Sequence, residues 1–441
     1  MNRLARSACA SLAFCWAFFE FAAGCAGAAQ PPNIVLIIAD DQAWTDYSFL
    51  GHRQVETPRI DRLARESVTY RRGYVPCSLC CPSLASLITG LYPHQHRITS
   101  NDPPLPPGME PRDFPRSAAF RDGREVMNRF LEAAPTLPRL LRGQEYLSLQ
   151  TGKWWQGDYS RGGFTHGMTR GDRHGDMGLD IGRKTMQPIY DFIRDARAGG
   201  KPFFVWYAPL MPHSPHTPPE RLLAKYQART DSSHIARYWA MIEWFDETVG
   251  ALLDHLNEQG LGDDTIVVYL ADNGWIQNPD SERYAAKSKQ SPYDGGLRTP
   301  IMVRWPGRAV PRMCETPVLS IDIAPTLLAA LGGTPTKEMQ GLNLLDESAV
   351  QSRKVICGEC FTHNAIELER PAANLRWRWI VEGSWKLIVP DGANEPNAAI
   401  ELYDLDTDPF ERNNVAAQRR ENVANLRAKL DDWWSPAGTG P

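Results

Sequence analysis

Short, uninterrupted apolar runs recur along the chain and predict strands. Residues 33–39 read NIVLIIA, and comparable runs occupy residues 203–208, 265–271 and 301–304. Runs that lack alternating polar positions are typical of strands covered on both faces, as in a parallel sheet. Helical patterns lie between them, over residues 57–65, 83–89, 136–141 and 238–259. This alternation predicts an α/β domain with a large doubly wound sheet.

The pattern changes after about residue 345. Residues 377–389 (WRWIVEGSWKLIV) and 400–405 (IELYDL) predict antiparallel strands, and residues 419–434 predict an amphipathic terminal helix. We therefore expect a large α/β domain over residues 30–344. A smaller subdomain, an antiparallel sheet plus a helix, is expected over residues 345–441.

The N-terminus has the pattern of an export signal. Arg3 and Arg6 precede an apolar stretch over residues 8–23, and the small residues at 26–28 fit cleavage by a signal peptidase. Residues 1–29 are therefore predicted to be a signal peptide, which implies a periplasmic or extracellular protein. Lipid attachment at Cys25 is the alternative. No later apolar run is long enough to cross a bilayer, so we expect no stable membrane span.

Net charge and cysteine content limit the partners and metal sites that the chain is expected to have. The 441 residues carry a formal net charge of −4 with a pI near 6.2, which argues against nucleic acid as a partner. Three of the nine cysteines precede residue 30. An exported setting permits disulfides among the other six. Cys357 and Cys360 form a lone CxxC pair, for which a local disulfide or two free thiols is expected rather than zinc.

Two pairs of residues with side-chain oxygen atoms follow two of the predicted strands. Asp40 and Asp41 come directly after residues 33–39, and Asp272 and Asn273 come directly after residues 265–271. In open α/β sheets ligands bind beyond the carboxyl ends of the strands. A single pair of this kind is commonly a helix cap. Two pairs at equivalent strand ends favour an all-oxygen site for Ca²⁺, or alternatively Mg²⁺.

The stretch CSLCCPSLASLITG, residues 77–90, places three thiols ahead of an apolar helix. Proline is favoured at the first helical position, so Pro82 predicts the start of this helix. Cys80 would then lie just before the helix N-terminus, where backbone N–H groups attract anions. Buried or disulfide-bonded cysteines are the alternative interpretation.

Several segments together resemble one family. They are NIVLIIADDQAWTD, TPRIDRLA, CCPSLASLITGLYP, TGKWW, PFFVWYAPLMPHSP, VVYLADNG, KQSPYDGGLRTPIMVRWPG and ELYDLDTDPFERNNVA, and they extend over nearly the whole mature chain. In number, order and spacing they resemble the sulfatase family of the alkaline phosphatase superfamily. The resemblance implies an alkaline-phosphatase-like fold and hydrolysis of sulfate esters.

The resemblance also assigns roles to residues. Cys80 takes the nucleophile position, which implies oxidation to formylglycine by a maturation enzyme. In the family, one hydroxyl of the aldehyde hydrate attacks sulfur, and the second then helps to expel sulfate and restore the aldehyde. Metal ligands, usually for calcium, are implied at Asp40, Asp41, Asp272 and Asn273. Sulfate contacts are implied at Lys153 and Lys289, and a histidine near the leaving-group oxygen at His213.

Two positions depart from the family pattern. Leu84 replaces the arginine of the usual Cys-x-Pro-Ser-Arg motif, which weakens the signal for maturation. Trp155 replaces the histidine of the usual Gly-Lys-Trp-His segment. Either another histidine, His216 or His166, supplies the missing imidazole, or Trp155 stacks on a sugar ring.

The expected substrate is a sulfated small molecule or a sulfated glycan. Two other functions are compatible with the same residues. One is hydrolysis of phosphomonoesters or phosphodiesters in the same kind of pocket. The other is a catalytically silent homologue that binds sulfated glycans, an interpretation supported by Leu84.

Overall fold

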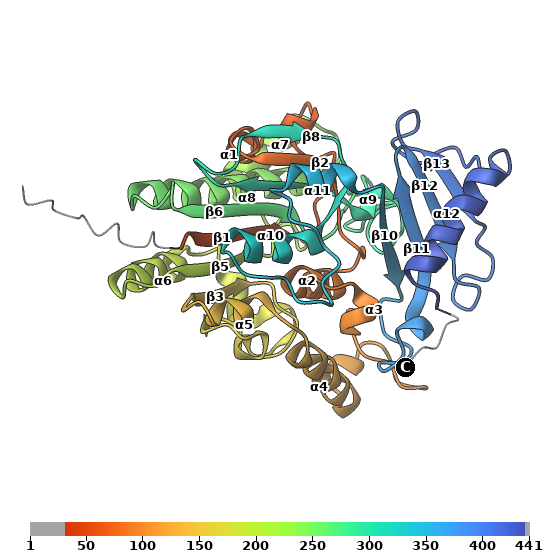
Figure 1. Ribbon diagram of the computed structural model, residues 1–441, viewed down its shortest axis with the longest axis horizontal. Coiled ribbons are helices and arrows are strands. Elements are labelled where there is room, and N and C mark those ends of the chain that lie inside the picture. The colour runs from red at the N-terminus through yellow and green to blue at the C-terminus, as the bar shows by residue number, and fades with distance from the viewer. Residues whose placement is uncertain (1–30, 437–441) are drawn as a thin grey trace, which may run out of the picture. The chain divides into compact units, whose positions relative to one another are not determined.

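The computed structural model describes residues 31–436, and the predicted signal peptide lies outside the described residues. A large mixed sheet has the strand order β4-β3-β5-β1-β6-β7-β2-β8, and β9 pairs with β2 (Figure 1). Its strands are β1 (Asn33–Ala39), β2 (Val68–Tyr74), β3 (Leu147–Gly152), β4 (His166–Gly167), β5 (Phe203–Ala208), β6 (Thr265–Ala271), β7 (Arg298–Arg304), β8 (Arg312–Cys314) and β9 (Val318–Leu319). Strands β3, β5, β1 and β6 run parallel, whereas β7 is antiparallel to both β6 and β2. The expected mixed, doubly wound α/β sheet is confirmed.

Strand β1 shows why an uninterrupted apolar run predicts this fold. Its alternate side chains Ile34, Leu36 and Ile38 belong to the core on one face of the sheet, and Val35 and Ile37 belong to the core on the other face. Both faces are therefore covered by helices, so neither set of positions is free to be polar.

Helices cover the two faces. The first core includes side chains from α2 (Cys80–Thr89), α4 (Ala118–Ala133), α5 (Leu137–Arg142) and α10 (Ile323–Ala330). The second includes side chains from α1 (Pro58–Arg65), α6 (Gln187–Ala198) and α8 (Ser233–Glu258). The remaining short helices are α3 (Pro93–His96), α7 (Glu220–Gln227), α9 (Asp294–Leu297) and α11 (Glu347–Ser352).

Helix α2 begins at Cys80, two residues before Pro82, which was the predicted first helical position. Leu79 is its N-cap, Cys80 its first residue and Pro82 its third. Proline is tolerated there because the N–H groups of the first turn have no intrahelical acceptor. The prediction that Pro82 opens the helix was therefore wrong. Cys80 lies on the first turn itself rather than ahead of it.

A second, antiparallel sheet has the order β10-β11-β12-β13, and α12 contacts β11 and β12 (Figure 1). Its elements are β10 (Val355–Phe361), β11 (Leu375–Glu382), β12 (Trp385–Pro390), β13 (Glu401–Asp404) and α12 (Arg420–Trp433). The predicted run 377–389 is thus two strands, which turn at Gly383 with a positive φ. The boundary predicted near residue 345 stays a prediction, because the described residues from 32 to 436 belong to one compact unit.

A buried ion triad joins the second sheet to the segment between β6 and β7 of the large sheet. Lys386 on β12 lies 2.7 Å from Asp294 Oδ1 and 2.8 Å from Glu411 Oε1, and its side chain is fully buried. The backbone N–H of Asp294 donates to Glu411 Oε2 at 2.6 Å. Asp294 opens α9, whose Gly296 carbonyl accepts from Gly274 N–H at 2.8 Å. The triad therefore supports the chain directly after Asn273.

The six cysteines of the described residues are free thiols, and all but Cys314 are buried. Cys357 and Cys360 lie three positions apart on β10, and they pack into different hydrophobic clusters. This arrangement fits the prediction of two free thiols rather than that of a local disulfide. Over residues 31–436 no helix is both long and apolar enough to cross a membrane.

Candidate active site

The pairs Asp40-Asp41 and Asp272-Asn273 meet at the carboxyl edge of the large sheet. Strands β1 and β6 are paired in register through Ala39 and Ala271, so the residues that follow them lie side by side. The Asp41 N–H donates to Asp272 Oδ1 at 3.1 Å, and the Asn273 amide donates to Asp41 Oδ1 at 2.6 Å. The structure brings together all four predicted metal ligands.

The hydrogen bonding of these residues leaves three buried oxygen atoms without a hydrogen bond. Within the described part of the chain, Asp40 Oδ2, Asp272 Oδ2 and Asn273 Oδ1 are buried and accept no hydrogen bond. Buried polar atoms without a partner are rare in folded proteins and call for a ligand. Hard oxygen donors of this kind fit Ca²⁺ or Mg²⁺. The residues present therefore fit the predicted ion.

Two buried lysines balance the carboxylates. Lys153 Nζ lies 2.6 Å from Asp40 Oδ1 and 3.5 Å from Asp272 Oδ2, and Lys289 Nζ lies 2.6 and 2.7 Å from the two Asp41 oxygens. Burial raises the pKa of Asp40 to about 6 and that of Asp272 to about 7. Burial would raise the pKa of Asp41 too, but Lys289 and its neighbours outweigh it and lower that pKa.

A close backbone approach positions Lys153. Gly152 at the end of β3 has a φ of +73°, and a Cβ there would meet the Ala208 carbonyl oxygen at 1.9 Å. Only glycine permits both the positive φ and this contact. The Lys153 N–H then donates to the same Ala208 carbonyl at 2.6 Å. Lys153 is thus directed toward the carboxylates of Asp40 and Asp272, which follow β1 and β6.

Cys80 faces this cluster. Its sulfur, one oxygen of Asp40 and one of Asp41 all lie within 4.8 Å of one another. Burial raises the pKa of the Cys80 thiol to about 12, although Lys153 and Lys289 oppose the shift. The Ser83 hydroxyl donates to the Asp272 carbonyl at 2.5 Å and so fixes the first turn of α2 against the end of β6.

Cys81 points elsewhere. Its sulfur accepts a hydrogen bond from the Gln156 amide at 3.0 Å, and its backbone N–H donates to Asn101 Oδ1 at 3.0 Å. Adjacent positions on a helix do not share a face, which explains why two neighbouring thiols have such different surroundings.

His213 reaches the cluster from the segment after β5. Its Nε2 lies 3.4 Å from Asp41 Oδ2, and its Nδ1 lies 2.5 Å from the Ser214 carbonyl oxygen, which can only accept. Nδ1 therefore carries the proton and Nε2 faces the carboxylates. Burial lowers the pKa of His213 to about 3, with Asp41 opposing.

A second imidazole, which the sequence does not predict, stands beside His213. The rings of His174 and His213 are 5.8 Å apart, and His174 also packs edge-on against Trp155 at 4.5 Å. His174 has a φ of +70°, and Gly175 and Asp176 after it also have positive φ values. Non-glycine residues adopt such angles only where their surroundings enforce them, and they do so most often at functional sites.

Contacts on both sides hold His174 in this conformation. Before it, Arg173 forms a two-pronged ion pair with Asp102 at 3.0 Å for each bond. After it, the Asp176 carboxylate accepts from backbone N–H groups at residues 170–172 and 177. Gly175 packs so closely on the Gly152 carbonyl that a Cβ would lie 2.4 Å from it. The loop is fastened directly to the segment that carries Lys153.

The two proposed substitutes for the missing histidine have different surroundings. His166 is exposed and packs on Phe192. His216 packs between Tyr238 and Trp275; burial lowers its pKa to about 4, and the nearby charge of Asp41 opposes that shift. Trp155 is only 3% exposed and carries Arg173 over its ring at 4.8 Å, so no face of it is open to a sugar. Stacking of a sugar on Trp155 is therefore not supported, whereas compensation by His216 or His166 stays a prediction. His174 is the histidine beside Trp155.

Carboxylates, lysines, a histidine pair and a cysteine thus converge at the carboxyl edge of a mixed α/β sheet. An oxygen-rich cation site next to buried lysines suits the binding of an anionic ester, and the fold and site together define a hydrolase of such esters built on a mixed sheet.

Comparisons with known proteins identify the family. The profile of the Sulfatase family matches residues 32–333, and that of N-sulphoglucosamine sulphohydrolase, C-terminal, matches residues 284–434. The chain is 26% identical over 411 residues to N-acetylgalactosamine-6-sulfatase of Homo sapiens, covering 82% of this chain and 74% of the relative.

Solved structures share the fold. Ps i-CgsB in complex with k-i-k-neocarrahexaose superposes with a TM-score of 0.72 at 20% identity, covering 92% of this chain and 93% of that one. A protein in complex with its substrate D-glucosamine-2-N,6-O-disulfate superposes with a TM-score of 0.70 at 19% identity, covering 92% and 98%. The chain belongs to the sulfatase family, and its reaction is the hydrolysis of sulfate esters.

Proposed function

We propose that the protein is an exported sulfatase that acts on sulfated glycans, with a formylglycine derived from Cys80 and a divalent cation, Ca²⁺ or alternatively Mg²⁺. The observation that carries this proposal is the convergence of the Cys80 sulfur with carboxylate oxygens of Asp40 and Asp41, within 4.8 Å of one another. Asp272 and Asn273 adjoin Asp41, and each of them has a buried oxygen without a hydrogen bond. A reactive group and a cation site are expected to lie this close where both act on one anion.

The ligand set and the modified residue supply distinct chemistry. When bound, a cation held by Asp40, Asp41, Asp272 and Asn273 supplies Lewis-acid stabilisation of the negative charge on a sulfate ester. Conversion of the Cys80 side chain to an aldehyde supplies a hydrate with two hydroxyl groups in place of a thiol. The high pKa of that thiol argues that the unmodified side chain is a poor nucleophile at neutral pH.

The remaining polar side chains bind the anion and move a proton. Lys153 and Lys289 present ammonium groups to the same pocket, where burial strengthens their attraction for sulfate oxygens. His213 has its free Nε2 on the pocket side, so this nitrogen is placed to exchange a proton with the ester oxygen. We assign His174 to the same wall of the pocket, as a second imidazole that orients the ester.

A glycan is the proposed substrate class. The names of the relative and the two solved structures refer to a sulfated sugar, a disulfated sugar and a carbohydrate hexaose. For this chain an exported location fits such a substrate, since Arg3, Arg6 and the apolar run after them form a signal-peptide pattern. Sequencing of the N-terminus of protein secreted by its native host tests this point, and a chain beginning near residue 29 is expected.

Peptide mass spectrometry tests the nucleophile. In protein purified from its native host, the peptide that contains residue 80 is expected to carry the aldehyde or its hydrate. The peptides that contain Cys357 and Cys360 serve as an internal control and are expected to remain thiols. Full sulfatase turnover by protein whose residue 80 is entirely a thiol would contradict the proposal.

A measurement of thermal stability tests cation binding independently of enzyme turnover. Addition of Ca²⁺ to chelator-treated protein is expected to raise the melting temperature, because the ion binds the folded state alone. Metal analysis is expected to find one Ca²⁺ or Mg²⁺ per chain. Stoichiometric zinc, or no shift with either ion, would contradict the assignment.

A further inference from the structure

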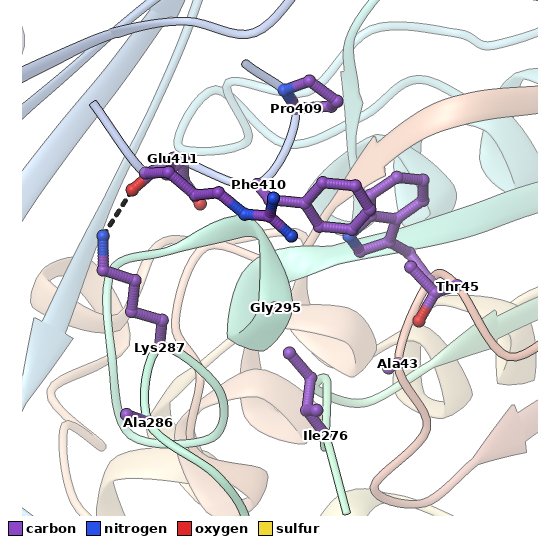
Figure 2. Close-up of a pocket in the computed structure, with 11 residues that line it drawn as sticks. Ala43, Thr45, Ile276, Ala286, Lys287, Gly295, Pro409, Phe410 and Glu411 are labelled. Atoms are coloured by element: carbon purple, nitrogen blue, oxygen red, sulfur yellow. Dashed lines mark hydrogen bonds between the residues drawn. The ribbon is translucent and has the colours of Figure 1, made fainter. Parts of the chain in front are cut away.

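A cavity of about 470 Å³ lies beside the candidate active site and takes no part in the chemistry described above. Three segments line it: residues 43–45 after β1, residues 276–295 after β6, and residues 409–412 after β13 (Figure 2). Its wall begins at Ala43 and Ile276, two residues after Asp41 and three after Asn273. Its volume lies within the range of small-molecule pockets, roughly 300–1,000 Å³.

An aromatic pair forms one wall. Trp44 and Phe410 are stacked with their ring centres 5.9 Å apart, and Figure 2 shows Phe410 held against the indole. Arg298 covers Trp44 at 4.0 Å, so the pair is fixed in place. Phe410 is nonetheless 50% exposed. A half-exposed ring that is held rigid offers an apolar surface to a ligand at little further cost in side-chain entropy.

The charge around this wall is positive. Lys287 donates to the Glu411 carbonyl (Figure 2) and lies over the Tyr293 ring at 4.4 Å. Arg412 lies over the Phe410 ring at 5.2 Å. Across residues 31–436, neither cation has a carboxylate within 4 Å. The Glu411 side chain is already paired with Lys386 at 2.8 Å. The cavity therefore attracts an anion that also has a ring.

We propose that this cavity, the Trp44 pocket, binds a second, anionic sugar unit of the glycan whose sulfate is hydrolysed at Cys80. The inference rests on the proposed function and adds to it, because it assigns a separate position to the neighbouring sugar. The exposed part of the Phe410 ring contacts apolar C–H groups of the pyranose, and Arg412 and Lys287 interact with its sulfate or carboxylate group.

Paired substrates separate this inference from the proposed function. Hydrolysis of 4-nitrophenyl sulfate and of a sulfated oligosaccharide is measured for the wild type, Phe410→Ala and Arg412→Gln. For each enzyme, kcat/KM for the oligosaccharide is divided by kcat/KM for the aryl sulfate. We expect this ratio to fall about tenfold in each variant, because the KM for the oligosaccharide rises. Met313→Ala is the control, since Met313 is similarly exposed at 48% but lies on β8. It should leave the ratio unchanged.

Binding gives a second readout that needs no turnover. In the Cys80→Ala background, titration calorimetry is expected to show an oligosaccharide Kd that rises about tenfold when Phe410→Ala is added. Uronate-containing and sulfated oligosaccharides distinguish the source of the charge, and a desulfated neutral oligosaccharide should bind more weakly than both. A wild type without sulfatase activity would refute the proposed function. Ratios and Kd values that stay within twofold of wild type would refute the Trp44 pocket.

Discussion

Replacement of Lys386 by methionine should destabilise the protein strongly. Lys386→Met keeps the length of the side chain but removes the charge that lies 2.7 Å from Asp294 and 2.8 Å from Glu411. Removal of one partner of a buried ion pair costs about 3–5 kcal/mol, because the remaining charges are buried without compensation. Tyr74 still donates to Asp294 at 3.1 Å, so we expect a loss near the lower end of that range, about 3 kcal/mol.

The assay is urea unfolding followed by tryptophan fluorescence, with Lys429→Met as the matched control. Lys429 pairs with Glu382 at 2.6 Å, but the two side chains are 45% and 34% exposed, and such surface pairs contribute about 0–1 kcal/mol. A Lys386→Met variant no less stable than Lys429→Met would refute the reasoning. A triple variant that also carries Asp294→Asn and Glu411→Gln should recover part of the loss, because no buried charge is then left unpaired.

The same variant should show a pH signature. Burial raises the pKa of Glu411 to about 7, and Lys386 acts to lower it. Lys386 also lowers the pKa of Asp294, against the effect of burial. Without Lys386 both carboxyl groups become harder to ionise, so the folded variant holds its protons to higher pH. The stability difference from wild type should therefore grow from pH 5 to pH 8.

Three further outcomes follow from the active site. Cys80→Ala should abolish hydrolysis of 4-nitrophenyl sulfate, whereas Cys81→Ala should retain most of it; normal turnover by Cys80→Ala would overturn the mechanism. His174→Ala should lower kcat by about 10²-fold, within the usual range for a proton-transfer or orienting imidazole, while His166→Ala should have no effect. Asp272→Asn should raise the melting temperature in chelator, because it removes one of three clustered carboxylates, and it should lose the shift on Ca²⁺ addition.

The strands that carry the metal ligands could be predicted because their environment is uniform. Residues 33–39 and 265–271 are buried on both faces, and the predicted bounds are those of β1 and β6. Strand β2 is different, since Arg71 and Arg72 interrupt its apolar pattern at a bulge in its pairing with β7. Periodicity alone does not reveal such a strand.

The candidate active site likewise has residues that the sequence predicts and residues that it does not. Asp40 and Asp272 come directly after predictable strands, so parallel pairing was enough to bring them together. His174 lies in an irregular segment with three successive positive φ values, and its position depends on Gly175 meeting Gly152. The only signal in the sequence is a glycine after a histidine, which is too common to be informative. Contacts between loops of this kind require the folded chain.

The arrangement of the thiols allows local unfolding of the protein to be followed by chemical labelling. A thiol reagent such as Ellman's should label Cys314 rapidly and the buried cysteines only as the structure opens. Cys357 packs with Leu430 of α12 on one face of β10, and Cys360 packs with Tyr92 on the other. Labelling of Cys357 alone would report detachment of the terminal helix α12. Labelling of both cysteines would report unfolding of β10, the strand that carries them. Two thiols three residues apart thus allow the opening of two structural layers to be timed separately in one unmodified protein.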